Sequence, residues 1–310
     1  MRRSEVLFLY DVKWGNPNGD PLDENKPRMD ETTSTLIVTD VRLKRTIRDY
    51  LQNACNETLW ITGEAVSPKS RLKELELKVP DKGEGKLEQL MKKLYEKCID
   101  VRLFGAVVPA VERGAMETSL TGPVQFRYGR SLHKVKWEFI QGTAAFLSKE
   151  GAEQRSFREE YVVPYVLIAF YGVVNDLAAK DTGLRDEDIE KMYKAMWFGT
   201  KNLITRSKME QTPRLLLIVE YKDGVKFHHG ELDYLVRVES EKDDFELRDV
   251  TDFKLQVGDL IDSLSTIKEK IEKIRFAVDK RLKTVCGQEE GSIETFLGKV
   301  VNDVEELKLE

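Results

Sequence analysis

Three dense apolar runs are the clearest predicted strands of the chain. An unbroken run that is rich in leucine, β-branched and aromatic residues is typical of a buried strand. The first run stays apolar at successive positions, which indicates burial on both of its faces. The three runs are Glu5–Trp14, Tyr161–Val174 and Arg214–Tyr221.

Three other segments repeat apolar residues every three or four positions, the spacing of an amphipathic helix. Thr39–Leu51 begins at a good N-cap residue, and Asp40 is favourably placed against the helix dipole. Asp186–Phe198 is followed by Gly199, a residue type that commonly ends helices. The longest pattern, Asp259–Lys283, predicts one continuous helix.

The remaining segments complete the predicted order of elements. Asn16–Leu36 is predicted to be a loop, because its prolines bar a helix. Asn56–Val101 is polar and mixed, and it looks like an insertion with a helix around Leu87–Tyr95. Thr121–Val135 is predicted to be a strand with cations along it, and Glu138–Glu160 an extended hairpin. Without the insertion the order is β-α-β-β-α-β, which predicts an α+β fold with a ferredoxin-like or RRM-like unit.

The charge is distributed unevenly along the 310 residues, whose formal net charge is −5. Glu231–Asp252 holds nine acids and three bases, and Glu289–Glu310 holds seven acids and two bases. The rest of the chain is therefore basic, and Thr118–Trp137 and Lys191–Met209 contain no acid at all. This distribution predicts a basic working surface with an acidic periphery. A charged content of 34% also favours a thermophilic source.

The composition bounds the compartment. The three cysteines, Cys55, Cys98 and Cys286, lie far apart in sequence and are predicted to be free thiols of a reducing cytoplasm. No apolar run reaches the roughly 18 residues that a membrane span needs. A cytoplasmic protein without a membrane partner is expected.

Enzymatic signatures are weak. There is no HExxH, CxxC, GxSxG, P-loop or Rossmann pattern, so no catalytic residue, metal or cofactor is predicted. Asp20, Asp23 and Asp30 share one loop and could bind Mg²⁺, although turns favour aspartate for purely local reasons. His133 is the one tempting general base, and a lone histidine on a strand is more often structural.

The loop GNPNGDP, Gly15–Pro21, and the helix after it form the first candidate RNA-binding set. Glycine and asparagine allow backbone N–H groups to approach a phosphate closely. Lys44, Arg45 and Arg48 lie early in the helix, where cations oppose the helix dipole, and this favours an external anion. The alternative is that these long side chains merely cover a helix face.

Two further sets have the composition of phosphate-binding segments. The first lies in the polar connection Thr205–Arg214, where cations flank a hydroxyl; an ordinary connection is the alternative. The second alternates cations with an aromatic residue, Tyr128, along a predicted strand, a pattern that suits single-stranded RNA. Their members are Arg206, Ser207 and Lys208, and Gln125, Arg127 and Arg130.

In this order the three sets resemble a backbone subunit of the CRISPR Cascade surveillance complex, in its type I-B form within the RAMP superfamily. The matching stretches span about residues 5–222. They are GNPNGDP, VTDVRLKRTIRDYL, DVRLFGA, TGPVQFRYGRSLHKV, VPYVLIAFYG and TRSKMEQTPRLLLIVEY.

The resemblance implies a right-hand shape. An RRM-like palm would comprise residues 1–55, 100–137 and 161–285, with a helical fingers insertion at 56–99 and a β-hairpin thumb at 138–160. An acidic C-terminal extension, 286–310, would complete the chain. Copies would stack head to tail along a guide RNA, and each thumb would kink the guide at regular intervals.

The resemblance also implies partners and contact residues. The partners would be the CRISPR guide RNA, target DNA paired to it, other copies of the chain, and the large, small and guide-end-capping subunits of Cascade. Type III relatives cut target RNA with a loop aspartate and Mg²⁺, which keeps such a nuclease as the alternative, and a purely structural protein is a third. The RNA-contact residues carried over are Asn16, Asn18, Lys44, Arg45, Arg48, Arg127, Arg130, Arg206, Ser207 and Lys208.

Overall fold

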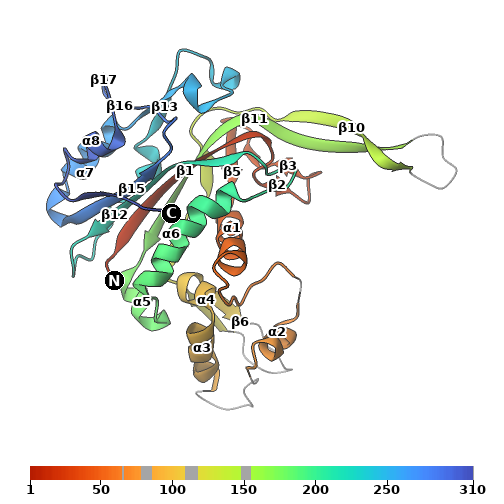
Figure 1. Ribbon diagram of the computed structural model, residues 1–310, viewed down its shortest axis with the longest axis vertical. Helices are drawn as coiled ribbons and strands as arrows, with labels where there is room; N and C mark the ends of the chain where they lie inside the picture. The colour runs from red at the N-terminus through yellow and green to blue at the C-terminus, as the bar shows by residue number, and fades with distance from the viewer. Residues whose placement is uncertain (65, 78–85, 109–117, 148–154, 310) are drawn as a thin grey trace.

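A computed structural model of the protein describes residues 1–64, 66–77, 86–108, 118–147 and 155–309. Within these residues one ten-stranded sheet forms the centre of the molecule (Figure 1). Its strands are β1 (Ser4–Gly15), β4 (Met29–Asp30), β5 (Thr35–Val38), β8 (Val124–Phe126), β9 (Gly129–Ser131), β10 (Glu138–Leu147), β11 (Arg155–Val174), β12 (Gln211–Tyr221), β15 (Ile271–Val278) and β18 (Val304–Glu306). Their order is β18–β15–β12–β1–β11–β9–β5–β4, and β8 and β10 also pair with β11.

β1 is the central strand, antiparallel to both β11 and β12. Every residue from Ser4 to Val12 is buried, because a packed layer covers each face of the sheet. The prediction of two-sided burial is therefore confirmed. The apolar runs predicted as strands at 161–174 and 214–221 are also confirmed, as parts of β11 and β12.

Two helices, α1 (Asp40–Asn53) and α6 (Asp186–Lys201), cover one face of the sheet. The Thr39 hydroxyl accepts a hydrogen bond from the Arg42 backbone N–H at 3.3 Å, which confirms the predicted N-cap of α1. Leu43, Ile47 and Leu51 of α1 enter the same core as alternate residues of β1. The helix therefore carries its remaining, largely basic face away from this core.

The predicted end of α6 at Gly199 is wrong, because the helix continues to Lys201. A Cβ atom on Gly199 would lie 3.0 Å from the Thr46 carbonyl oxygen and 3.0 Å from the Tyr50 Cβ. The glycine therefore serves the close crossing of α1 and α6 instead of ending the helix.

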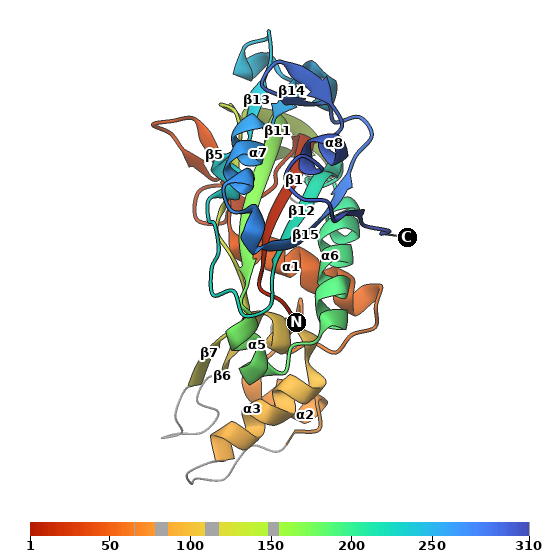
Figure 2. The ribbon, with the colours of Figure 1, turned by 90° about the vertical axis from the view of Figure 1, so that its left-hand side faces the viewer.

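A C-terminal layer covers the opposite face of the sheet (Figure 2). It contains a small four-stranded sheet, two short helices and four 3-10 turns. These elements are β13 (Arg237–Glu239), β14 (Lys254–Gln256), β16 (Thr284–Cys286), β17 (Glu289–Gly291), α7 (Gly258–Ser265), α8 (Ile293–Leu297), η1 (Leu232–Tyr234), η2 (Asp244–Glu246), η3 (Val250–Asp252) and η4 (Lys268–Lys270).

The single helix predicted over 259–283 is wrong. The chain is helical only in α7, and it then enters β15, which pairs with β12 and β18. Ile271, Ile274 and Phe276 are buried in the core of the C-terminal layer. β-branched residues fit a strand as well as a helix, and the open edge of β12 provides pairing partners that periodicity does not reveal.

A separate cluster of apolar side chains lies at one end of the molecule, where α3 forms part of it and the predicted helix around 87–95 is confirmed. This cluster also includes Ala106 and Leu120, beyond the predicted insertion. The elements at this end are α2 (Pro68–Glu74), α3 (Lys86–Lys97), α4 (Ile99–Phe104), α5 (Asp176–Thr182), β6 (Gly105–Val108) and β7 (Thr118–Thr121). The division into domains stays a prediction.

β10 and the first half of β11 form a long antiparallel hairpin that projects from the body (Figure 1). Residues 148–154 of the predicted hairpin lie outside the described residues. The single strand predicted at 121–135 is instead divided between β8 and β9. The predicted loop at 16–36 contains a short ladder of β2 (Gly19–Asp20) and β3 (Lys26–Pro27), besides β4 and the start of β5. The described part of the chain is thus a mixed α+β protein with several sheets.

No helix in the described ranges combines the length and the apolarity that a bilayer crossing requires.

Candidate nucleic-acid interface

The end of β1 and the segment before β12 form one junction. The backbone N–H of Lys13 donates to the Glu210 carbonyl at 3.3 Å, and that of Asn16 donates to the Ser207 carbonyl at 2.7 Å. The Lys208 ammonium donates to the Asn16 carbonyl at 3.0 Å. Two predicted RNA-contact sets that are far apart in sequence therefore lie side by side.

Asn16 and Asn18 shape the loop of this junction. Asn16 is buried, and its amide nitrogen donates to the Asn25 carbonyl at 2.7 Å. The Asn18 amide oxygen accepts from the backbone N–H of Thr39 at 2.8 Å and from its hydroxyl at 2.9 Å. The loop is thereby tied to the start of α1. Direct contact of either asparagine with RNA stays a prediction.

Two of the predicted cations of α1 form ion pairs within the helix. Lys44 lies 3.0 Å from Asp40, and Arg45 lies 2.7 Å from Asp49. Both pairs are partly exposed, so both cations remain within reach of solvent. Each cation is nevertheless already compensated by a carboxylate of the same helix.

Arg48 is placed differently, because it lies inside the protein. Its guanidinium is 2.9 Å from the Asp100 carboxylate, and the two side chains are 9% and 1% exposed. Asp100 also accepts hydrogen bonds from the backbone N–H groups of Trp60 and Ile61, at 2.7 and 3.1 Å. The structure thus places Arg48 in a buried bridge between α1 and α4, away from any surface that RNA could reach.

Arg42, which the sequence reasoning did not select, lies near Lys208. The Arg42 guanidinium donates to the Thr46 hydroxyl at 3.1 Å. Within the described residues, neither Arg42 nor Lys208 has a carboxylate at ion-pair distance. Burial lowers the pKa of Arg42. Burial, followed by the charge of Arg42, lowers the pKa of Lys208 to about 8.

These two cations are therefore held partly desolvated and uncompensated. Removing a charge from water is unfavourable unless an opposite charge accompanies it. The nearby Arg206 is 67% exposed and pairs with Glu160 at 3.1 Å. An anion that bound between Arg42 and Lys208 would restore the missing compensation. The acid-free window around Lys208 was the sequence signal for this site, whereas Arg42 resembled its paired neighbours.

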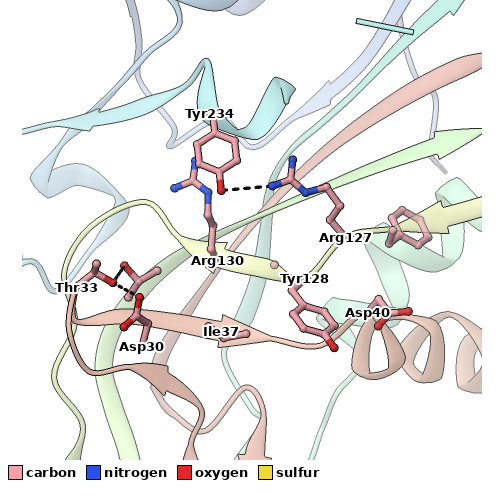
Figure 3. Close-up of a pocket in the computed structure, with 11 residues that line it drawn as sticks. Asp30, Thr33, Ile37, Asp40, Arg127, Tyr128, Arg130 and Tyr234 are labelled. Carbon is pink, nitrogen blue, oxygen red and sulfur yellow. Dashed lines mark hydrogen bonds between the residues drawn. The ribbon is translucent and has the colours of Figure 1, made fainter. Parts of the chain in front are cut away.

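A cavity of about 680 Å³ lies at the edge of the sheet near the start of α1. Its lining includes Arg127, Tyr128 and Arg130 (Figure 3). Tyr128 is 63% exposed. Asp30 and Asp40 lie on the other side of the cavity, so its rim carries both signs of charge.

Tyr234 of η1 organises the two arginines of this cavity. The Arg130 guanidinium lies 3.8 Å from the centre of the Tyr234 ring, and Arg127 donates to the Tyr234 hydroxyl at 3.3 Å. The buried Asp233 carboxylate is 3.3 Å from Arg130 and 3.8 Å from Arg127. One acid thus serves two cations. Gln125 is exposed, and its amide nitrogen donates to the Gly122 carbonyl at 2.8 Å.

The loop aspartates of the nuclease alternative are engaged separately. Asp20 pairs with Arg28 at 2.8 Å, and Asp23 pairs with Lys26 at 2.8 Å. Asp30 accepts from the Thr33 hydroxyl at 2.9 Å. In the described residues, no group of three or more His, Cys, Asp or Glu side chains could hold a metal ion. This arrangement does not favour a metal-dependent nuclease.

His133 is a buried structural residue. Its Nδ1 lies 3.0 Å from the Lys134 carbonyl, and its Nε2 accepts from the Leu167 backbone N–H at 3.2 Å. Both ring nitrogens are therefore occupied by backbone groups. Burial lowers the pKa of the imidazole, which keeps it neutral. The arrangement offers no free general base.

Comparisons with known proteins agree over nearly the whole chain. The family model described as "CRISPR-associated protein Cas7" matches residues 2–258. A curated protein of Haloferax volcanii with the same description is 31% identical over 331 aligned positions, which cover 99% of this chain and 96% of the relative.

Solved structures show the same fold. A chain titled "CRISPR RNA-guided surveillance complex" matches with a TM-score of 0.55 at 14% identity, over 99% of this chain and 94% of its own. A chain titled "CRISPR RNA-guided surveillance complex, pre-nicking" matches with a TM-score of 0.55 at 12% identity, over 99% and 97%. The family model and the relative in Haloferax volcanii establish that this chain belongs to the Cas7 family of CRISPR-associated proteins.

Proposed function

We propose that this chain is a guide-RNA-binding backbone subunit of a type I CRISPR Cascade surveillance complex. Membership of the Cas7 family supports this, as does the fold shared with chains of CRISPR RNA-guided surveillance complexes. In the proposal, copies stack head to tail along the guide in the cytoplasm, together with the large, small and guide-end-capping subunits. The protein holds the RNA backbone, and base pairing by the guide reads the target DNA.

The architecture supports the roles implied by the hand-like arrangement. The strand order β12–β1–β11–β9, with α1 and α6 on one face, is the order expected for an RRM-like palm. The projecting hairpin of β10 and β11 is the candidate thumb, and the α2–α4 region is the candidate fingers. The type I-B form remains part of the proposal.

The observation that carries the proposal is the uncompensated pair Arg42 and Lys208. Both lie at the junction of the GNPNGDP loop, α1 and the segment before β12. A phosphate is the anion that a partly desolvated guanidinium and ammonium would hold well. Contacts of this kind position a strand without reading its sequence, as a guide-holding subunit requires.

The first experiment compares the chain purified alone with the chain co-expressed with a CRISPR array. The mass distribution and the ratio of absorbance at 260 and 280 nm are measured before and after RNase treatment. We expect large RNA-containing particles that collapse on RNase treatment. RNA-free monomers in both preparations would contradict the proposal.

Variants then test the carrying observation. Lys208→Ala and Arg42→Ala should each weaken binding to single-stranded RNA and reduce the slope of log affinity against log salt by about 0.7 per lost phosphate contact. Lys226→Ala is the matched control, because Lys226 is exposed beyond the opposite end of β12. Equal slopes for all three variants would remove the pair from the RNA site.

A further inference from the structure

Three large apolar side chains are exposed at the junction of β1 and the segment before β12. Trp14 is 54% exposed, Met209 is 51% exposed and Ile204 is 74% exposed. An indole left in water beside cations is a poor choice for stability alone, because burial is the favourable state of such a ring. This exposed group calls for a partner outside the described residues.

The register of the junction places Trp14 opposite Met209. β1 and β12 pair in one antiparallel register up to Gln211, and the hydrogen bonds from Lys13 to Glu210 and from Asn16 to Ser207 continue it. In that register Trp14 faces Met209 across the ladder, and Gly15 faces Lys208. Residues directly opposite each other in an antiparallel pair are close neighbours.

The backbone at Trp14 is strained. Its φ is +44°, in the left-handed region that bulky side chains rarely adopt. Glu210, one position along the other strand from Met209, also has a positive φ, of +65°. Such conformations persist where the surroundings impose them, and they concentrate at binding sites. The glycine that would adopt this conformation freely is the next residue, Gly15, and not residue 14.

The charges around Trp14 indicate the class of partner. Lys208 lies opposite the neighbouring Gly15, and Arg42 lies close enough to lower the Lys208 pKa by its charge. Neither cation has a carboxylate at ion-pair distance in the described residues. An exposed flat ring next to uncompensated cations matches one unit of a single nucleic-acid strand, which has a base to stack and a phosphate to neutralise.

We propose that Trp14, with Met209 opposite it, is a stacking platform for one unpaired base of the guide RNA, whose backbone phosphate lies on Lys208 and Arg42. This inference rests on the proposed function and adds to it a residue that holds a base by its face. A stacked face is available on every base, so the platform accepts any guide sequence.

The test measures binding of the full chain to a single-stranded RNA of mixed sequence over a series of salt concentrations. Trp14→Ala should weaken binding about 5- to 150-fold, the usual effect of losing one base–aromatic stack. The salt slope should stay unchanged, because no phosphate contact is lost. Trp14→Tyr should retain most of the affinity, and the control Val41→Ala, an exposed apolar residue of α1, should retain all of it.

A second RNA separates stacking from other causes. In an RNA whose bases are replaced by abasic residues, Trp14→Ala and the unaltered chain should bind equally. Trp14→Gly removes the ring and also releases the left-handed strain, so it should raise the melting temperature and still lose the same affinity as Trp14→Ala. This variant keeps the test decisive if Trp14→Ala folds poorly.

Several results would overturn the platform and leave guide binding standing. One is unchanged RNA affinity of Trp14→Ala and Trp14→Gly while Lys208→Ala still binds weakly. Another is an equal loss on abasic RNA. A third is a loss of self-association alone, which would assign Trp14 to contact with a second copy of the chain. If Lys208→Ala and Arg42→Ala also bind RNA normally, the proposed function itself has failed.

Discussion

The basic face of α1 and the junction beside it look alike in sequence and differ in the structure. On α1, each of the three cations selected from the sequence has a carboxylate partner. At the junction, Arg42 and Lys208 have none at ion-pair distance in the described residues, and burial lowers the pKa of both. Cation density therefore does not identify a phosphate site. The relevant quantity is the charge left after the protein's own acids are counted.

Arg48 should show the largest effect in this comparison, and the effect should be on stability. Arg48→Ala leaves the 1%-exposed Asp100 without its cation. Breaking a buried pair in this way typically costs about 3–5 kcal/mol of the free energy of unfolding. The loss is measured by denaturant unfolding, and RNA affinity of the folded fraction should stay unchanged.

The double variant Arg48→Met with Asp100→Leu is the control for that prediction. It removes both charges and should recover part of the lost stability, although the N–H groups of Trp60 and Ile61 then lose their acceptor. If Arg48→Ala were stable and bound RNA weakly, the distinction between a structural cation and a ligand-binding cation would be broken at this position.

Much of the fold could be predicted from local pattern. The strands β1, β11 and β12 follow from unbroken apolar runs, and α1 follows from helical spacing after the Thr39 cap. The error at 259–283 has a physical origin. Ile271, Ile274 and Val278 satisfy helical spacing, and pairing with β12 and β18 makes them part of a strand.

The site was less predictable, because its decisive contacts join distant segments. The acid-free windows pointed to Arg130 and Lys208, yet Tyr234, which packs on Arg130, lies in a segment that looked acidic and peripheral. No local signal says that Asp100 will neutralise Arg48. Periodicity gives the face of a helix, whereas only tertiary structure gives its partners.

The second prediction uses the titration of Lys208. Its pKa of about 8 in the free protein means that its positive charge is present at pH 7 and is lost as the pH rises through 8. RNA affinity should therefore fall between about pH 7 and 9, by up to about tenfold for one charge-assisted contact. Binding is measured at constant ionic strength across that range.

Lys208→Arg is the control for the pH dependence, because a guanidinium keeps its charge throughout this range. The variant should bind RNA with a flat pH profile. A decline in Lys208→Arg that matched the unaltered chain would assign the titration to another group and would leave Lys208 without a role in charge compensation.

The smallest effects should come from Lys44 and Arg45, which the sequence selected first. Lys44→Ala and Arg45→Ala each remove a partly exposed pair within one helix, so each should change the free energy of unfolding by less than about 1 kcal/mol. RNA binding should weaken less than in Lys208→Ala, because an arriving phosphate competes with Asp40 or Asp49 for the cation. The salt slopes of the three variants, measured side by side, decide this. If Lys44→Ala reduces the slope as much as Lys208→Ala does, then the acids of α1 move away from their cations when RNA binds, and pairing in the free chain is not what separates the two regions.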